Sequence, residues 1–262
     1  AYVHGFDGRD VIAGAGTIGL ELAEQRPDLD AVVVPVGGAG LVAGVGLALK
    51  TLRPNVEIVG VEPDACPSFA EALELGEPGP AATRPTLADG LAVPTVGPNA
   101  FALARTVVDR VVSVDEESIG LAILRLREME RAVVEGGGAG TLAAFLAGRL
   151  EHLKGKRVAL LLCGGNIDPA VLGRIIEHGL VADGRLLRFR ATISDRPGGL
   201  ARFTADLAAT GASVRQIAHE RAFAHADVST VDVEVVAEAS DRAHAATIVG
   251  DLRSRGYAVS AS

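Results

Sequence analysis

The sequence predicts an α/β fold built on a parallel twisted sheet, followed by a smaller ferredoxin-like α+β domain. Its 262 residues suit one medium and one small domain. Up to about residue 178, short strands that are apolar on both faces alternate with helices, which is typical of a parallel sheet covered on each side. Beyond about Gly184 the order becomes βαββαβ, which is the ferredoxin-like order.

In the first part, β-branched and apolar runs predict the strands. The run AVVVPV forms the first strand, at 31–36, and RVALLLC, which is apolar after its first residue, forms the last, at 157–163. A Pro-rich stretch at 77–99 is long for a structureless connection, and such loops are usually functional or disordered. The other predicted strands are 56–62 and 110–114, and the predicted helices are 10–26, 41–52, 68–76, 99–109, one from about Asp115, 135–150 and 168–178.

In the second part, alternating apolar and polar residues predict the first strand at 186–194. A helix at 198–210, a strand pair, a helix at 241–254 and a final strand from Tyr257 complete the order. The polar turn VADGRL at 181–186 is the predicted linker. The predicted domains are therefore 1–180 and 185–262, and the strand pair is 212–223 with 226–238.

Composition and charge disfavour several classes of protein. The net charge is −8, with a pI of about 5.3 and no basic stripe, which argues against a nucleic-acid partner. No apolar run reaches the roughly 18 residues of a membrane helix, and the first ten residues do not resemble a signal peptide. Cys66 and Cys163 lie far apart without CxxC spacing, so a cytoplasmic protein with reduced thiols is expected.

The motif GAGTIG at 14–19 matches the GxGxxG pattern of dinucleotide-binding loops. That mechanism requires a buried strand before the first glycine and an acidic residue after a second strand. Only three apolar residues precede the motif, and the run VVVPV leads into glycines with no acid. We therefore interpret GAGTIG as a tightly packed helix start.

Three other glycine clusters follow strands or open helices, and they agree with one another. They are Gly37-Gly38-Ala39-Gly40, Gly136-Gly137-Gly138 and Gly164-Gly165. In a parallel sheet, ligands bind outside the carboxyl ends of the strands, so the three clusters predict one crevice. The first cluster opens the helix 41–52, where bare backbone N–H groups suit a phosphate. The alternative is a sharp turn that needs glycine only for its geometry.

Cys163 and Glu135 are candidate ligand-facing residues at this crevice. Cys163 ends the apolar strand, and its alternative role is that of a small buried hydrophobe. Glu135 precedes a glycine cluster and suits a substrate-side acid or base, or else a charge favoured by the helix dipole. The six histidines show no metal-ligand spacing, and we expect surface or packing roles for His4, His152, His178, His219, His225 and His244.

Six motifs in order carry a family resemblance. They are FDGRDVIAGAGTIGLE, VVVPVGGAGLVAGV, VGVEP, TLADGLAV, VVEGGGAG and LLCGGNIDP. Over about residues 4–178 the sequence resembles the second part of threonine dehydratases, which are fold-type-II pyridoxal-phosphate (PLP) enzymes. The resemblance implies an incomplete tryptophan synthase β-like sheet. DRPGGLARF, at 195–203, resembles an ACT domain, a regulatory module that binds amino acids.

The resemblance implies roles for individual residues. The cofactor phosphate loop would be formed by Gly37, Gly38, Ala39, Gly40 and Leu41. Ala39 departs from the family's four glycines. Cys163 matches the residue that faces the pyridine nitrogen, Gly90 lies beside the ring, and Glu135 is the substrate-side carboxylate. Effector binding falls to the turn Asp195, Arg196, Pro197, Gly198, Gly199 and Leu200.

The implied reaction converts L-threonine to 2-oxobutanoate and ammonia, with L-serine as a slower substrate that yields pyruvate. Related serine racemases have an acidic metal site that begins at the Glu of VEP. Here Ser68 stands in place of the acidic partner of Glu62, so we expect no metal. Since ACT domains commonly pair through edge strands, a homodimer or homotetramer is expected. Serine dehydratase or racemase activity is the alternative.

The family's Schiff-base lysine lies in a Ser-Phe-Lys type motif that residues 1–262 do not contain. Lys50 should lie about 15 Å along its helix from the phosphate loop. Lys154 and Lys156 precede the strand 157–163 and should lie roughly 20 Å from Cys163. We therefore expect a fragment of a threonine dehydratase that is inactive alone. The alternative is a standalone, catalytically inactive amino-acid-binding protein.

Overall fold

The computed structural model describes residues 3–220 and 229–261, which form two compact units. The first unit is Ala1–Ile175 and the second is Ile176–Ser262. The boundary falls inside helix α7 (Pro169–Ala182), a few residues before the predicted linker at 181–186. The apolar residues of this helix extend beyond residue 178, so the helix replaces part of the expected turn.

The first unit contains a four-stranded parallel sheet, as predicted. Its strands lie in the order β3-β2-β1-β4, and every pairing is parallel. Ala31, Val32, Val33 and Val34 of β1 are completely buried, because helices cover both faces of the sheet. The strands are β1 (Ala31–Pro35), β2 (Glu57–Pro63), β3 (Arg110–Val114) and β4 (Val158–Leu160).

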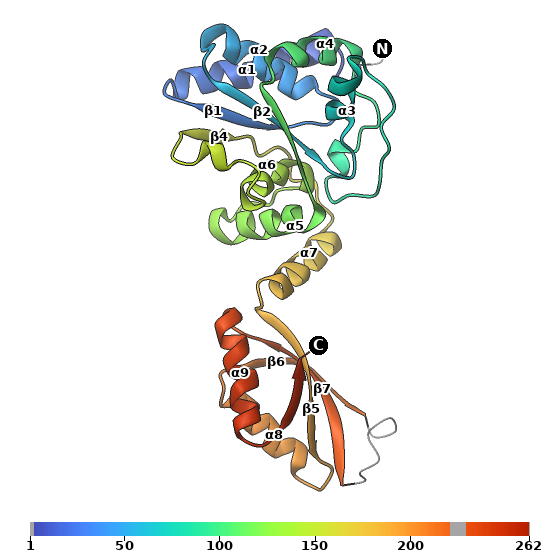
Figure 1. The fold of residues 1–262 in the computed structure, drawn as a ribbon, viewed down its shortest axis with the longest axis vertical. Coiled ribbons are helices and arrows are strands. Elements are labelled where there is room, and N and C mark those ends of the chain that lie inside the picture. The colour runs from blue at the N-terminus through green and yellow to red at the C-terminus, as the bar shows by residue number, and fades with distance from the viewer. Residues whose placement is uncertain (1–2, 221–228, 262) are drawn as a thin grey trace. The chain divides into compact units, whose positions relative to one another are not determined.

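Two helical layers cover this sheet (Figure 1). One layer packs against Val32 and Val34 of β1, and the other packs against Ala31 and Val33. The period of two along the strand therefore builds a separate core on each face. The first layer is α1 (Arg9–Gln25), α2 (Gly40–Leu52) and α4 (Pro98–Val107), and the second is α5 (Glu116–Arg125) and α6 (Gly136–Leu146). Shorter elements are α3 (Ser68–Leu75) and the single turns η1 (Asp89–Leu91), η2 (Leu126–Glu130) and η3 (Glu151–Leu153).

The predicted strand at 157–163 is shorter in the structure. Strand β4 ends at Leu160, although the Leu161 N–H still donates to the Val33 carbonyl at 3.0 Å. Strand β4 lies at the edge of the sheet. Of the described strands, it pairs with β1 alone. The Leu161 carbonyl instead accepts from the Thr141 hydroxyl of α6 at 3.3 Å. The chain thereby leaves the sheet before Cys163.

GAGTIG lies inside α1 and does not start a helix, which corrects our interpretation. A Cβ on Gly19 would approach the Val45 carbonyl of α2 to 2.7 Å, and one on Gly44 would approach the Ile12 carbonyl to 2.2 Å. The glycines therefore let α1 and α2 pack backbone to backbone. Because helical residues of α1 lead into the motif, it lacks the geometry of a dinucleotide loop.

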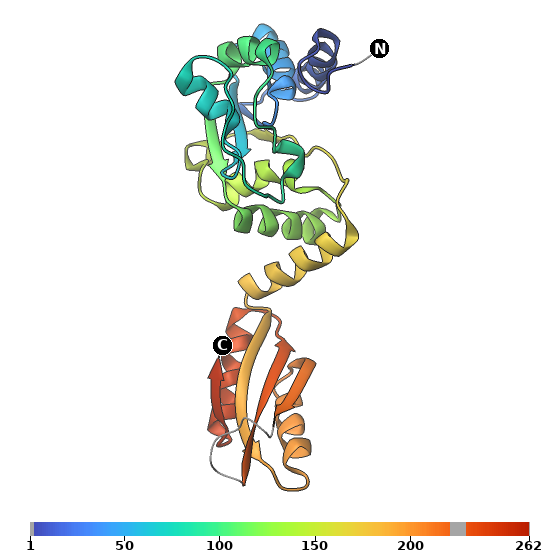
Figure 2. The ribbon, with the colours of Figure 1, turned by 90° about the vertical axis from the view of Figure 1, so that its right-hand side faces the viewer.

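The second unit has the predicted βαββαβ order. Its antiparallel sheet runs β6-β7-β5-β8, and α8 and α9 cover one face (Figure 2). The large side chains Phe189, Phe203, Leu207, Ile248 and Leu252 fill the core between sheet and helices. The predicted turn between 223 and 226 lies outside the described residues. The elements are β5 (Leu186–Ser194), α8 (Gly199–Ala208), β6 (Ser213–Glu220), β7 (Thr230–Glu238), α9 (Arg242–Ser254) and β8 (Ala258–Ala261).

Among the described residues, no helix is both long enough and apolar enough to span a membrane.

Candidate active site

A cavity of about 390 Å³ opens beyond the carboxyl end of β1, where Pro35 leads into the first glycine cluster. All eight residues predicted for the cofactor and substrate in the first unit line this one cavity. Segments far apart in the sequence therefore meet at the predicted edge of the sheet. The eight residues are Gly37, Gly38, Ala39, Gly40, Leu41, Gly90, Glu135 and Cys163.

The glycine loop after β1 is packed so closely that side chains would not fit. A Cβ on Gly38 would lie 2.2 Å from the Phe6 ring, and one on Gly40 would lie 2.0 Å from the Phe6 carbonyl. A Cβ on Gly37 would meet the Leu91 Cα at 3.1 Å. The close packing explains the glycines and leaves their backbone as a wall of the cavity.

Ala39 departs from this pattern, because it adopts the left-handed conformation with φ 68°. A non-glycine residue in that region is strained by about 1–2 kcal/mol. Ala39 is the N-cap of α2. Among the described residues, no side chain caps this helix by a hydrogen bond, and its first turn contains no acidic residue. The first N–H groups of a helix have no intrahelical partner and favour an anion. The residues around the loop therefore fit a phosphate group.

Glu135 is the N-cap of α6, and its carboxylate lies between two loops. A Cβ on Gly164 would come within 2.3 Å of Glu135 Oε1, and one on Gly90 within 3.5 Å. The Glu135 N–H donates to the Gly164 carbonyl at 3.2 Å, and Gly164 has a positive φ of 76°. Gly164 thus provides both the turn and the space that hold the carboxylate at the cavity wall.

Cys163 lies where the chain has left the sheet, against the start of α6. A Cβ on Gly138 would meet the Cys163 carbonyl oxygen at 2.0 Å. Burial raises the pKa of the Cys163 thiol, and the negative charge of Glu135 raises it further. The thiol is therefore neutral at physiological pH, and it forms no disulfide.

Phe6 is a cavity residue that the sequence reasoning did not single out. Its ring packs edge-on against His4, with centroids 4.6 Å apart. The next residue, Asp7, accepts from the Ala100 N–H at the start of α4 at 2.8 Å, which fixes the backbone beside Phe6. The signal in the sequence that could have indicated Phe6 was an isolated Phe-Asp pair in the polar stretch GFDGRD. The other lining residues not foreseen are Gly5, Val11, Ala15, Pro35, Leu91 and Val93.

Glu62, considered above for a metal site, is completely buried and its carboxylate caps α3. Its two oxygens accept from the N–H groups of Phe69 at 2.7 Å and Ala70 at 2.9 Å. Burial raises the pKa of Glu62 to about 7 in spite of these two hydrogen bonds. Nowhere in residues 3–220 and 229–261 do three or more His, Cys, Asp or Glu side chains gather to hold a metal ion.

The three lysines do not line the cavity. Lys50 Nζ lies 2.7 Å from a carboxylate oxygen of Asp109, just before β3 begins. Lys156 Nζ lies 3.5 Å from a carboxylate oxygen of Glu57, the first residue of β2, and Lys154 is exposed two residues earlier. These positions belong to the amino end of the parallel strands, opposite the cavity.

In the second unit, four of the six predicted effector residues, 195–198, form the turn between β5 and α8, and Gly199 and Leu200 begin α8. Gly198 has a φ of 88° and is the N-cap of α8, and Asp195 Oδ1 lies 3.9 Å from His219 Nε2 on β6. A Cβ on Gly199 would lie 2.0 Å from the Ser194 carbonyl, so the turn requires glycine there.

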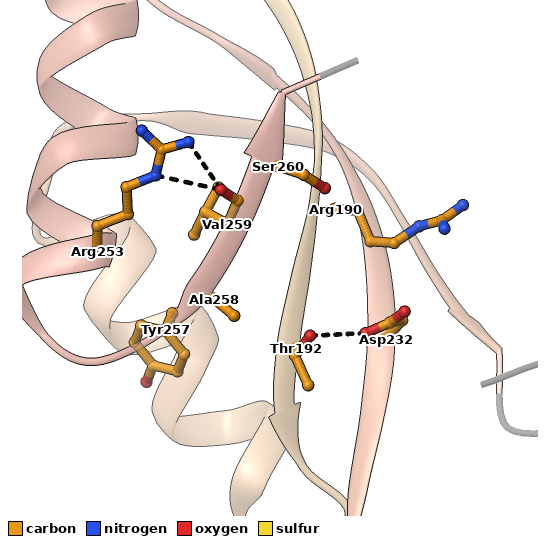
Figure 3. A pocket seen from close by; sticks show the side chains of 8 residues that line it. All are labelled: Arg190, Thr192, Asp232, Arg253, Tyr257, Ala258, Val259 and Ser260. Carbon is orange, nitrogen blue, oxygen red and sulfur yellow. Dashed lines mark hydrogen bonds between the residues drawn. The ribbon is translucent and has the colours of Figure 1, made fainter. Parts of the chain in front are cut away.

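A separate polar cavity of about 450 Å³ lies beside β8 (Figure 3). It contains none of the predicted effector residues. Arg253 donates to the Val259 carbonyl at 2.8 and 3.1 Å, and Figure 3 shows the Arg190 guanidinium pointing to the opposite side. The two cationic groups do not converge on one ligand position.

Comparison with known proteins connects the cavity to a family. Residues 1–164 match the family model described as "Pyridoxal-phosphate dependent enzyme". The L-threonine ammonia-lyase of Thermotoga maritima is 42% identical over 258 residues, which are 98% of this chain and 64% of that protein. The chain thus spans less than two thirds of the length of this relative.

Solved structures agree with the comparison of sequences. Threonine deaminase isoform 2 from Solanum lycopersicum superimposes with a TM-score of 0.64 at 35% identity, over 68% of this chain and 52% of that chain. A serine racemase from Dictyostelium discoideum gives a TM-score of 0.59 at 37% identity, over 63% and 53% of the two chains.

Proposed function

Because the chain belongs to the family of pyridoxal-phosphate dependent enzymes, we propose that its cavity holds that cofactor and that the protein deaminates L-threonine. The overall reaction yields 2-oxobutanoate and ammonia, and L-serine would yield pyruvate and ammonia. The observation that carries the proposal is the convergence of the first glycine loop, Gly90, Glu135 and Cys163 on one cavity. The similarity to threonine ammonia-lyase and threonine deaminase supports this choice of substrate.

The phosphate would be held by backbone groups. No Lys, Arg or His occurs among the described residues that line the cavity, so the N–H groups of the loop 37–41 and the amino end of α2 would provide the positive potential. Phe6 and Leu91 pack against the glycines of this loop. Gly90 has no side chain of its own, which would leave room for a flat ring at that wall of the cavity.

The bound cofactor supplies an electron sink for bond cleavage at the substrate Cα. Cys163 would face the ring nitrogen as a neutral thiol, which leaves that nitrogen without a full positive charge. Glu135 would face the substrate, where Oε1 can hold a proton that moves to or from the amino acid. Gly138 packs against the Cys163 backbone, and Gly164 leaves the space that the Glu135 carboxylate occupies.

We also propose that the lysine which links the cofactor is not among residues 1–262. Lys50 and Lys156 are paired with carboxylates at the other end of the sheet, and Lys154 is exposed there. Residues 1–262 alone would then bind the cofactor without catalysing the reaction.

The second unit would be an ACT domain that binds an amino-acid effector at the turn Asp195–Leu200. The βαββαβ order, the positive φ of Gly198 and the exposed turn support this role. Pairing of edge strands would produce a homodimer or homotetramer. The free thiols Cys66 and Cys163 support a reducing compartment such as the cytoplasm.

The similarity to a serine racemase favours a second candidate activity on L-serine. Both candidates are tested by adding L-threonine or L-serine to the complete enzyme and measuring ketoacid, ammonia and D-serine. We expect 2-oxobutanoate from threonine at a higher rate than pyruvate from serine. D-serine without ketoacid would overturn the lyase proposal.

A further inference from the structure

One acidic residue outside the cavity has no role in the function proposed above. Glu116 lies in the first turn of α5, directly after the N-cap Asp115, and it does not line the cavity. Both of its carboxylate oxygens accept hydrogen bonds from the segment 86–91, which is TLADGL. Thr86 Oγ1 donates to Glu116 Oε1 at 2.5 Å, and the Leu87 N–H donates to Oε2 at 2.7 Å.

The segment 86–91 lies between two glycine loops of the cavity. On one side, a Cβ on Gly37 would meet the Leu91 Cα at 3.1 Å. On the other side, a Cβ on Gly136 would meet the Leu87 carbonyl oxygen at 2.0 Å. A small displacement of the segment would therefore change the spacing of both loops.

The remaining hydrogen bonds of the segment are local, and two of them go to the N–H groups of Ala92 and Val93 directly after it. The Leu91 N–H donates to the Ala88 carbonyl at 2.8 Å, and the Ala88 N–H donates to Thr86 Oγ1 at 3.0 Å. Within the described residues, the hydrogen bonds that tie 86–91 to another element all end on Glu116. The Thr86 hydroxyl connects the two sets, because it donates to Glu116 and accepts from Ala88.

We propose that Glu116 is a positioning residue, which acts through Thr86 and Leu87 to hold Gly90 and Leu91 at the distance from the glycine loop that the cofactor requires. The inference rests on the proposed function for its ligand, while the positioning itself is a property of the free protein. Glu116 touches neither substrate nor cofactor, so its effect is on binding and on the order of the segment.

The test compares Glu116→Ala with Glu117→Ala in the 262-residue chain. Glu117 is exposed and lies in the same first turn of α5. Its replacement therefore removes one negative charge from the same helix terminus and leaves the hydrogen bonds to 86–91 in place. Three measurements are made on each variant: amide hydrogen exchange over 86–91, the alkylation rate of Cys163, and the dissociation constant of pyridoxal phosphate from its fluorescence. Circular dichroism establishes that each variant is folded.

In Glu116→Ala we expect faster exchange at 86–91, faster alkylation of Cys163 and a dissociation constant raised about 10-fold, because two charge-assisted hydrogen bonds are lost. Glu117→Ala and the conservative Thr86→Ser should match the parent protein, while Thr86→Val should resemble Glu116→Ala. If the parent does not bind pyridoxal phosphate, the proposed function fails, and hydrogen exchange with Cys163 alkylation still decides the positioning. A folded Glu116→Ala protein with parental exchange, alkylation and affinity would overturn the inference.

Discussion

Replacing Glu62 with glutamine would make the stability of the first unit less dependent on pH. The buried carboxyl accepts two backbone N–H groups at the start of α3, yet burial raises its pKa to about 7. The folded protein therefore binds this proton more tightly than the unfolded chain, whose carboxyl has an ordinary value of 4.5. The resulting stabilisation is fully present below pH 4.5 and is lost as the pH rises through 7.

The size of the effect follows from the two pKa values. A rise from 4.5 to about 7 corresponds to about 3 kcal/mol between the protonation states. Glutamine does not titrate, although its NH₂ group leaves one N–H of α3 without an acceptor at a cost of about 1–3 kcal/mol. This cost is the same at every pH. The stability of the parent protein minus that of Glu62→Gln should therefore fall by about 3 kcal/mol between pH 4.5 and about pH 8.

Urea unfolding, followed by circular dichroism at several pH values, measures this difference. Glu74→Gln is the matched control, because Glu74 lies in the same helix and is exposed. Its difference from the parent protein should not vary with pH. A Glu62 difference that stays flat, or that rises with pH, would refute the reasoning, since it would mean that the two N–H groups hold the carboxylate ionised.

Three further predictions concern the cavity and the second unit. Gly38→Ala should weaken binding of pyridoxal phosphate about 10-fold or more, because the new Cβ would lie 2.2 Å from the Phe6 ring. Gly14→Ala is the control, since its Cβ would have no neighbour within 4 Å, and it should bind normally in the same fluorescence titration. Ala39→Gly should not lower the urea midpoint, since relief of the positive φ of 68° offsets the entropy of glycine, and a clear loss of stability would contradict the strain assigned to Ala39. Burial and a hydrogen bond to Asp206 raise the pKa of Tyr257 to about 12, so Asp206→Asn should lower the pH at which the phenolate absorbance of this tyrosine appears. An unchanged titration would refute that contribution of Asp206.

Much of the fold was predictable because local patterns dominate its strands. The strand at 110–114 and the strand at 186–194 have the predicted limits in the structure, since their apolar residues follow the expected period. The predicted strand at 157–163 was too long. Its run of apolar residues did not indicate that β4 would lie at an edge of the sheet. The prediction that GAGTIG starts a helix was wrong. Its glycines are explained by close packing on α2, and the sequence of one segment does not show which other helix it will contact.

The candidate site was predictable where glycine clusters follow strands, because parallel topology brings those ends together. The contact of Phe6 with Gly38 was not predictable, since 32 positions separate the two residues and no periodic pattern connects them. The pairing of Thr86 with Glu116 spans 30 positions and likewise depends on the finished fold. Motifs thus indicated which backbone lines the cavity, and the structure was needed to find the side chains that hold it.

The central claim is that residues 1–262 form a cradle for pyridoxal phosphate without the lysine that links it. The direct test is to add the cofactor to this chain, reduce the mixture with borohydride and locate any attached cofactor by peptide mass spectrometry, beside an equilibrium titration. We expect saturable binding that inorganic phosphate competes away, with no lysine labelled in proportion to the occupied cavity. Stoichiometric labelling of Lys50, Lys154 or Lys156, or the absence of saturable binding, would contradict the account.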